Sequence, residues 1–272
     1  MKLLTTILAV LMAALAMASP LSKSTTNSLN TTLATTTLMS NLTNKMDKPK
    51  QDSTWAGAIQ KGRGVTEVRG TINVPHVHGS SPYSGRAWIG LDNAEDGSCS
   101  ADVRAGIVWS ILGNGTTTYN AFWTFNPGKS LLLDAGTLIV EPGDEVVFGI
   151  QAKNKYTVDI WMTNQRTGGE YSHTIDGFKK QKNKLCLKQA EWILENPSSG
   201  GFEPEIRWQK AAWRHKAEYG SGSVVWVPEE AEVKNIVKDG WQLTTCGLFK
   251  EENKDTDADW GMGVQCGCNC SW

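Results

Sequence analysis

The stretch GTLIVEPGDEVVFGIQA, residues 136–152, decides the fold. Two apolar, β-branched runs flank the sequence Glu141-Pro142-Gly143-Asp144, in which Pro and Gly hold the two central positions of a β-turn. Apolar runs on both sides of such a turn are the sequence signature of two paired strands. We therefore expect strands that include Ile139-Val140 and Val146-Val147, joined by a turn at Pro142-Gly143.

Similar segments recur along the chain after residue 52, separated by Gly, Asn and Pro turns. They are VTEVRGTINVP (65–75), GRAWIGLD (85–92), RAGIVWSI (104–111), TYNAFWTF (118–125), YTVDIWMTNQRTGG (156–169), AEWILE (190–195) and SVVWVP (223–228). One helix is expected within 228–240. Many short strands at regular spacing predict an all-β protein, an antiparallel two-sheet β-sandwich of the lectin-like jelly-roll kind.

The N-terminal residues 1–18 have the features of a secretory signal peptide. A single lysine precedes an apolar run that ends in Ala16-Met17-Ala18, a small-residue cleavage pattern. The run is shorter than the roughly 20 residues that a membrane-spanning helix needs. We expect cleavage after Ala18 and a secreted, extracellular product without a membrane anchor.

Residues 19–51 are rich in Ser, Thr and Asn and lack aromatic side chains, so they are predicted to be a disordered pro-segment or stalk. Removing residues 1–51 takes away five lysines and one aspartate, which leaves 22 basic and 27 acidic residues and a net charge of −5. This mildly acidic remainder, 52–272, has the length of a single β-sandwich domain. Its charge argues against a nucleic-acid partner, because binding to phosphates needs a basic face.

Six cysteines in an exported chain predict disulfide bonds. Six thiols can pair in 15 ways, and the residues alone do not choose among them. Sequons for N-glycosylation start at Asn30, Asn41, Asn114 and Asn269. His76 and His78 have the spacing of two metal ligands, but they sit in a Pro- and Gly-flanked loop, so no metal site is predicted.

The order of motifs resembles the glutamic peptidases, or eqolisins, a family of secreted and mostly fungal acid endopeptidases. The matching segments are STWAGAIQKGRGVTEVRGTINVP (53–75), AWIGLDNAEDGSCSADVRAGIVW (87–109), TYNAFWTFNP (118–127), EPGDEVV (141–147), NQRTGG (164–169) and CLKQAEWILE (186–195). The resemblance is dense from Thr54 to Glu195 and thinner to about residue 262; the tail 263–272 is left open. It implies two packed antiparallel sheets with a polypeptide substrate across a concave face.

The resemblance also implies a catalytic carboxylate. The family's glutamate lies in an Ala-Glu-Trp-Ile motif, which here is Ala190-Glu191-Trp192-Ile193. Glu191 would act first as general base toward water and then as general acid toward the leaving amine. Strand alternation places Glu191, Ile193 and Glu195 on one face, and bulky neighbours would partly desolvate the carboxyl and raise its pKa. The pattern alone favours the other interpretation, in which Glu191 and Glu195 lie on the solvated face of an edge strand; the motif match favours the catalytic role.

Two positions depart from the family pattern. The family's catalytic glutamine aligns with Arg104, next to the recognisable Ala105-Gly106-Ile107, and Thr124 stands where a glutamate is expected. A guanidinium can donate N–H groups to an oxyanion. Its fixed charge would also lower the pKa of Glu191. The sequence therefore leaves open whether the enzyme is fully active or impaired.

The resemblance also assigns positions around this pair. Trp55, Trp88 and Asp92 match scaffold or substrate-groove positions, and Asp144 matches another. Cys99 and Cys186 flank the two catalytic strands, so we predict a disulfide between them.

Neither metal nor organic cofactor is needed for this chemistry, and we expect a monomer. The alternative is a non-catalytic secreted β-sandwich that binds carbohydrate or protein through a Trp-lined groove.

Overall fold

The computed structural model describes residues 54–77, 82–92, 99–176, 183–195, 205–216, 223–251 and 261–268. The chain divides into two compact units, 1–48 and 49–272, and every described residue belongs to the second. The predicted signal peptide and pro-segment, His78 and the sequons at Asn30, Asn41 and Asn269 lie outside the described residues. No helix among the described residues is long and apolar enough to span a membrane.

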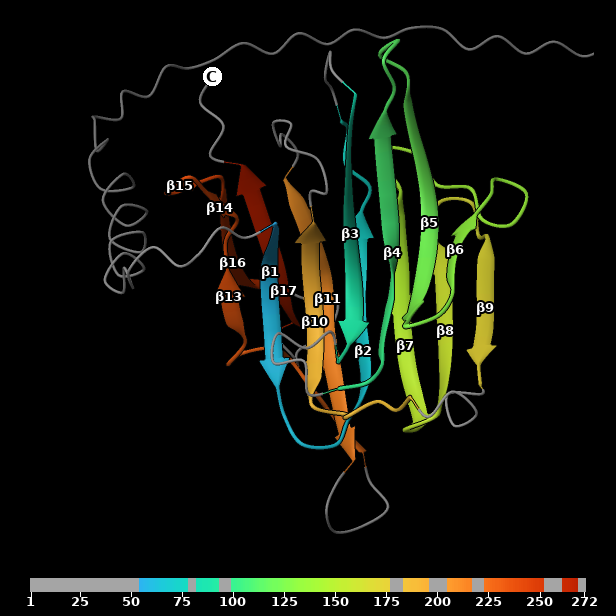
Figure 1. Cartoon of the computed structure of the whole chain (residues 1–272), viewed down its shortest axis with the longest axis vertical. Helices are drawn as coiled ribbons and strands as arrows, with labels where there is room; N and C mark the ends of the chain where they lie inside the picture. The colour runs from blue at the N-terminus through green and yellow to red at the C-terminus, as the bar shows by residue number, and fades with distance from the viewer. Residues whose placement is uncertain are drawn as a thin grey trace, which may run out of the picture. The chain divides into compact units, whose positions relative to one another are not determined.

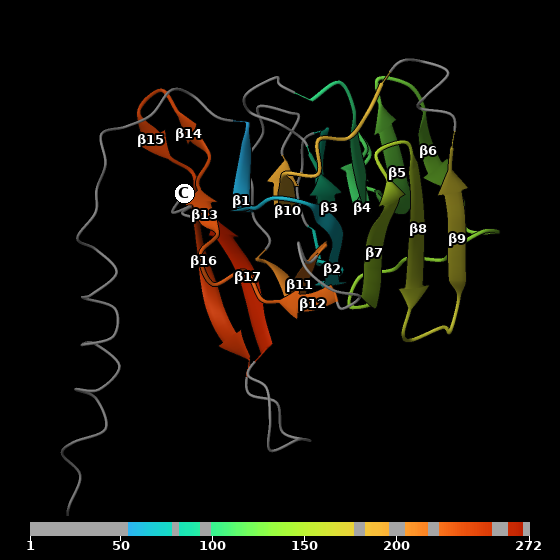
Figure 2. The same cartoon turned by 90° about the horizontal axis from the view of Figure 1, so that it is seen from below.

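Two antiparallel sheets form the fold, as predicted, and they pack as two layers (Figure 1; Figure 2). The first, seven-stranded sheet has the order β13 (Glu232–Lys234), β1 (Trp55–Lys61), β10 (Gln189–Glu195), β3 (Tyr83–Leu91), β4 (Asp102–Ile111), β5 (Thr117–Asn126) and β6 (Ser130–Leu133). β10, late in the chain, lies between β1 and β3. Long-range strand pairing thus places the Glu191 motif in the middle of this sheet.

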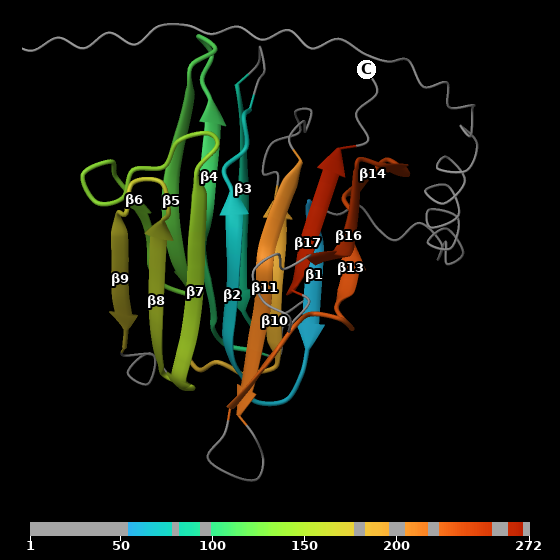
Figure 3. The ribbon, with the colours of Figure 1, turned by 180° about the vertical axis from the view of Figure 1, so that it is seen from behind.

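The second sheet covers the inner face of the first and is seen from behind in Figure 3. Its order is β16 (Thr244–Glu251), β17 (Gly261–Cys268), β11 (Ile206–Lys216), β2 (Val65–Asn73), β7 (Glu145–Asn154), β8 (Thr157–Asn164) and β9 (Glu170–Ile175), with β12 (Ser223–Trp226) paired to β11. A small third sheet pairs β14 (Val237–Lys238) with β15 (Trp241–Gln242).

Side chains from both sheets fill the space between them. Trp192 of β10 is fully buried there, and its indole N–H donates to the backbone oxygen of Arg69 in β2 at 2.8 Å. Trp109 and Trp123 also belong to this core. The alternation of β10 therefore directs Ala190, Trp192 and Leu194 inward and leaves its other residues on the outer face.

Two local predictions are wrong. The turn at Pro142-Gly143 is present, with Gly143 at φ +85°, but Ile139-Val140 is not a strand. The side chain of Asn164 bonds the carbonyl oxygen of Ile139 at 2.9 Å, so a side chain satisfies this backbone instead of a strand ladder.

The predicted helix within 228–240 is replaced by the short strands β13 and β14. Pairing of Val233 with Ala58 at the sheet edge outweighs local helix propensity.

Two disulfides are present in the described part of the chain. Cys99–Cys186 is the pair that the sequence predicted, and Cys246–Cys266 joins neighbouring strands β16 and β17. Cys270 lies outside the described residues.

Candidate active site

Glu191 belongs to one cross-strand row on the outer face of the seven-stranded sheet. The row runs Ile59 (β1), Glu191 (β10), Gly90 (β3), Arg104 (β4) and Thr124 (β5), each residue directly opposite the next. Directly opposed residues project from the same face of a sheet. The two predicted catalytic residues therefore lie on one face, two strands apart, with a residue that has no side chain between them.

The side chain of Glu191 is fully buried, with 0 % exposure. Burial is thus more complete than the partial desolvation expected from the sequence. An apolar cluster of Ile59, Trp88, Phe122 and Ile193 lies on the same outer face, and Trp55 packs against it. This cluster gives the row an apolar surround of low local dielectric.

Trp88 lies across the row. A Cβ placed on Gly90 would be 2.7 Å from Cζ3 of Trp88, so the indole covers the space that glycine leaves open. The guanidinium carbon of Arg104 is 4.9 Å from the centre of the Trp88 ring, which is the distance of a cation–π contact. Gly90 therefore makes room for an aromatic ring between Glu191 and Arg104.

Arg104 is held by carboxylates. Its Nε donates to Oδ1 of Asp102 at 2.9 Å, and its Nη1 is 4.0 Å from Oε2 of Glu195. Arg86 forms a closer pair with Glu195, at 3.0 Å, and the indole N–H of Trp88 donates to the same carboxylate at 3.3 Å. These two arginines and two carboxylates thus form a network on the same sheet face as Glu191.

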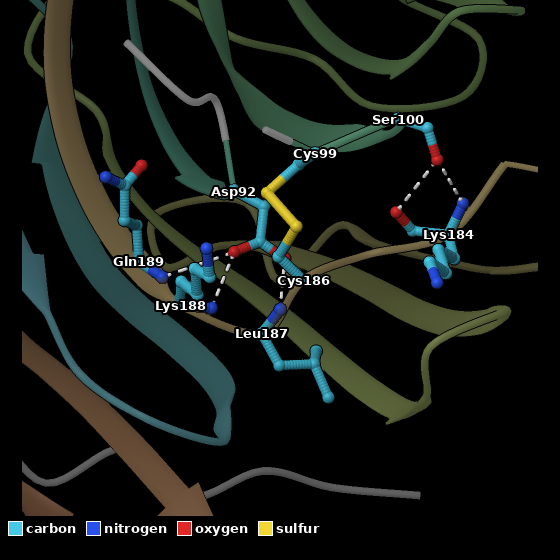
Figure 4. The surroundings of a disulfide bond; sticks show 8 residues. All are labelled: Asp92, Cys99, Ser100, Lys184, Cys186, Leu187, Lys188 and Gln189. Carbon is cyan, nitrogen blue, oxygen red and sulfur yellow. Dashed lines mark hydrogen bonds between the residues drawn. A yellow bond between two sulfur atoms is a disulfide. The ribbon is translucent and has the colours of Figure 1, made fainter. Parts of the chain in front are cut away.

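The remaining predicted groove residues have different environments. The Trp55 ring is partly buried and lies 4.9 Å from Nζ of Lys234. Asp92 is 1 % exposed and accepts backbone N–H groups of Leu187, Lys188 and Gln189 at 2.6, 2.7 and 3.2 Å. Asp92 therefore anchors the segment that leads into β10 and is covered by it (Figure 4).

Two other contacts hold this segment (Figure 4). The disulfide between Cys186 in the segment and Cys99 ties the segment to the residues before β4, and the Ser100 hydroxyl accepts the Lys184 N–H at 2.9 Å. Burial raises the pKa of Asp92, and the hydrogen bonds from the backbone oppose that rise. The segment before Glu191 is fixed by covalent and polar contacts together.

Asn114, the predicted glycosylation site, is exposed in the turn between β4 and β5. Among the described residues, no cluster of three or more His, Cys, Asp or Glu side chains is arranged to hold a metal ion.

Arg104 was predicted from the sequence, but the residues that hold it were not. Asp102 lies two positions before Arg104 on the same strand, so alternation alone places both side chains on one face. The pairing of Arg86 with Glu195 had no such signal, because it depends on β10 lying next to β3.

An antiparallel sandwich with an Ala-Glu-Trp-Ile strand beneath an outer apolar cluster defines a glutamic-peptidase type of protein. Residues 53–256 match the model of the Peptidase A4 family, and the chain belongs to that family. The resemblance expected from the sequence is confirmed.

Two relatives and two solved structures illustrate the similarity. Aspergillopepsin-2 of Aspergillus niger is 28 % identical over 221 residues, covering 74 % of this chain and 76 % of the relative. Scytalidopepsin B of Scytalidium lignicola is 26 % identical over 204 residues, covering 72 % and 75 %.

The crystal structure of Scytalido-glutamic peptidase with a peptide-based transition state analog aligns with a TM-score of 0.61 and 23 % identity, covering 79 % of this chain and 98 % of that one. Aspergilloglutamic peptidase from Aspergillus niger aligns with a TM-score of 0.51 and 24 % identity, covering 68 % and 99 %. These structures share the fold with this chain.

Proposed function

We propose that this protein is a secreted endopeptidase that hydrolyses peptide bonds of polypeptide substrates at acid pH. Glu191 is the general base and acid, and Arg104 donates N–H groups to the oxyanion. The observation that supports this most is the placement of both residues on one row of the outer face, separated only by Gly90. Membership of a peptidase family supports the reaction class.

The proposed reaction needs no group beyond these two and water. Glu191 takes a proton from water as the water oxygen bonds to the peptide carbonyl carbon. Arg104 stabilises the negative charge that develops on the carbonyl oxygen. The tetrahedral carbon then expels the amine as the C–N bond breaks, and Glu191 returns the proton to the amine nitrogen. The carboxylate is restored at the end of the cycle.

The burial of Glu191 sets a condition on this reaction. With 0 % exposure, the carboxyl reaches a substrate water only if the outer-face cluster opens when a peptide binds. Trp88 is the side chain that lies over the row, so its movement would open the space above Gly90.

The proposed location outside the cell has two supports. The N-terminal 18 residues read as a signal peptide, and the two disulfides suit an oxidising compartment. We propose that the secreted protein is a monomer, with residues 52–272 as its domain, and is glycosylated at Asn114.

The test is digestion of an acid-denatured protein by the secreted product of the full chain. The wild type is expected to release peptides at acid pH, and Glu191→Gln to lower the rate by about 10²–10⁴-fold, the usual contribution of a general acid–base group. Glu205→Gln is the control, because Glu205 is about half exposed, pairs with Arg207 and lies next to β11 of the other sheet. Equal rates for Glu191→Gln and the control would refute the assignment.

A second candidate is a non-catalytic member that binds carbohydrate or protein through its outer face. Two observations favour it: Glu191 has no exposed surface, and Arg104 takes the place that the resemblance gives to a glutamine. If this candidate holds, the wild type releases no peptides, and Trp55→Ala, which removes a ring at the border of the outer-face cluster, weakens binding of the ligand.

A further inference from the structure

The guanidinium of Arg104 is fixed in place by three groups from three strands. Asp102 (β4) accepts its Nε–H at 2.9 Å, Trp88 (β3) lies 4.9 Å beneath it, and Glu195 (β10) approaches its Nη1 to 4.0 Å. Only 19 % of the Arg104 side chain is exposed. A long side chain with this many contacts has one preferred direction.

The carboxylate of Asp102 is itself held in a fixed direction. Its Oδ1 accepts from Arg104, and its Oδ2 accepts from Nδ2 of Asn126 at 3.0 Å, so both oxygens are used. Asp102 and Asn126 are directly opposed on β4 and β5, and the Asp102 side chain is 9 % exposed. Hydrogen bonds to both oxygens fix the direction of the carboxylate, which in turn fixes the guanidinium.

The position of Arg104 matters because of Glu191. Two inter-strand spacings of about 4.8 Å put the Cα atoms of the pair roughly 10 Å apart, and an extended arginine spans much of that gap. A guanidinium that swung over Gly90 toward Glu191 would stabilise the ionised carboxyl. A carboxylate stabilised in this way is a weaker base toward water, so it takes up less readily the proton that it must later give to the leaving amine.

We infer that Asp102 is a positioning residue that holds Arg104 along the face of Trp88 and so keeps its charge away from Glu191. The inference rests on the proposed roles of Glu191 and Arg104. It adds to those roles that Asp102 is the residue that allows Arg104 to lie on the same row as the general acid–base carboxyl.

Other charges face the same row and enter any titration of Glu191. Within the described strands they are Lys61 on β1, Glu232 and Lys234 on β13, Arg86 on β3, Asp102 and Arg104 on β4, and Glu195 on β10. Glu195 cannot replace Asp102 as the main partner, because it is already paired with Arg86 through both oxygens.

The test separates positioning from a simple field effect. The titration of Glu191 is followed by ¹³C NMR of its side-chain carboxyl, assigned by the peak that Glu191→Gln removes. Four proteins are compared: wild type, Asp102→Asn, Arg104→Gln and the double variant. Removing the Asp102 charge lowers the pKa of Glu191 through the field alone, and that contribution is the same with or without Arg104.

The expected result is non-additivity. Asp102→Asn should lower the pKa of Glu191 by more than about one unit when Arg104 is present, because the freed guanidinium then approaches the carboxyl. In the Arg104→Gln background the same change should lower it by less than half as much. Equal shifts in the two backgrounds would overturn the inference. If Asp102→Asn does not fold, Asp102→Ser removes the same charge and is measured instead.

Asp159→Asn is the matched control. Asp159 also pairs with a cation, Lys153, at 2.7 Å, but it lies on β8 in the other sheet. It should leave the titration of Glu191 unchanged in both backgrounds. This readout does not depend on turnover. Non-additive pKa shifts in a protein that releases no peptides would support the inference and refute the proposed function. Additive pKa shifts in a protein that releases peptides would refute the inference and support the proposed function.

Discussion

Glu191 and Arg104 lie on one row of the seven-stranded sheet with Gly90 between them, and the Trp88 ring occupies the space above that glycine. A side chain at position 90 would collide with the ring, whose Cζ3 lies 2.7 Å from the place of its Cβ. The packing of the Trp88 ring therefore requires glycine at position 90, in the row that holds both proposed catalytic residues.

Gly90→Ala should consequently affect both stability and activity. Overpacking a buried site costs about 1–3 kcal/mol, and displacement of Trp88 should also lower the rate of peptide hydrolysis. Urea unfolding and a peptide-release assay measure the two effects. Gly247→Ala is the matched control, because it also lies in a strand but a Cβ there meets nothing within 4 Å. If both variants unfold at the same urea concentration, this account of Gly90 fails.

Replacement of Arg104 tests whether its guanidinium donates N–H groups to the oxyanion or takes no part in the reaction. Arg104→Ala removes the proposed N–H donor and should lower kcat by about 10²–10³-fold, as loss of an oxyanion donor does. Arg104→Gln keeps a neutral N–H donor and should be at least as active as the wild type. Arg207→Ala, which removes an arginine paired with Glu205 on the other sheet, serves as the control. Full activity in Arg104→Ala would exclude a catalytic role.

The two disulfides should differ in their contribution to stability. Cys99–Cys186 closes a loop of 87 residues and Cys246–Cys266 one of 20. Loop-closure entropy predicts a loss of about 4–5 kcal/mol for replacing the first pair by alanines and about 3 kcal/mol for the second. Equilibrium unfolding in urea measures both. A larger loss for the Cys246–Cys266 pair would contradict the entropic account.

The fold and the family could be predicted from the sequence because both depend on local patterns. Alternating strands and turn residues such as Pro142-Gly143 specify a sandwich, and the Ala190–Ile193 motif places one carboxylate on the outer face. The two local errors arose where tertiary contacts replace local preference: the Asn164 amide bonds Ile139, and β13 joins the sheet edge beside β1.

The arrangement around Arg104 is only partly local. Its pairing with Asp102 follows from alternation along β4 and was within reach of the sequence. The approach of Glu195 to Arg86, 109 residues earlier in the chain, and to Arg104 depends on β10 lying beside β3 and close to β4. No spacing rule in one sequence gives that neighbour, and the same holds for Trp88 filling the space over Gly90.

Asp144 should make stability depend on pH in a defined direction. Burial would raise the pKa of this carboxyl, but its ion pair with Arg166 and hydrogen bonds from the Glu141 N–H (2.9 Å) and the Asn164 amide (2.6 Å) lower it overall. Because the folded pKa lies below the unfolded value, the stabilisation is present above about pH 4 and is lost as the pH falls through the folded value. Asp144→Asn should therefore cost about 2 kcal/mol in urea unfolding at pH 6 and much less near pH 2. Asp134→Asn, in an exposed turn where the amide keeps the acceptor for Thr137, is the control and should show little change with pH. A cost for Asp144→Asn that grows on acidification would contradict the assignment.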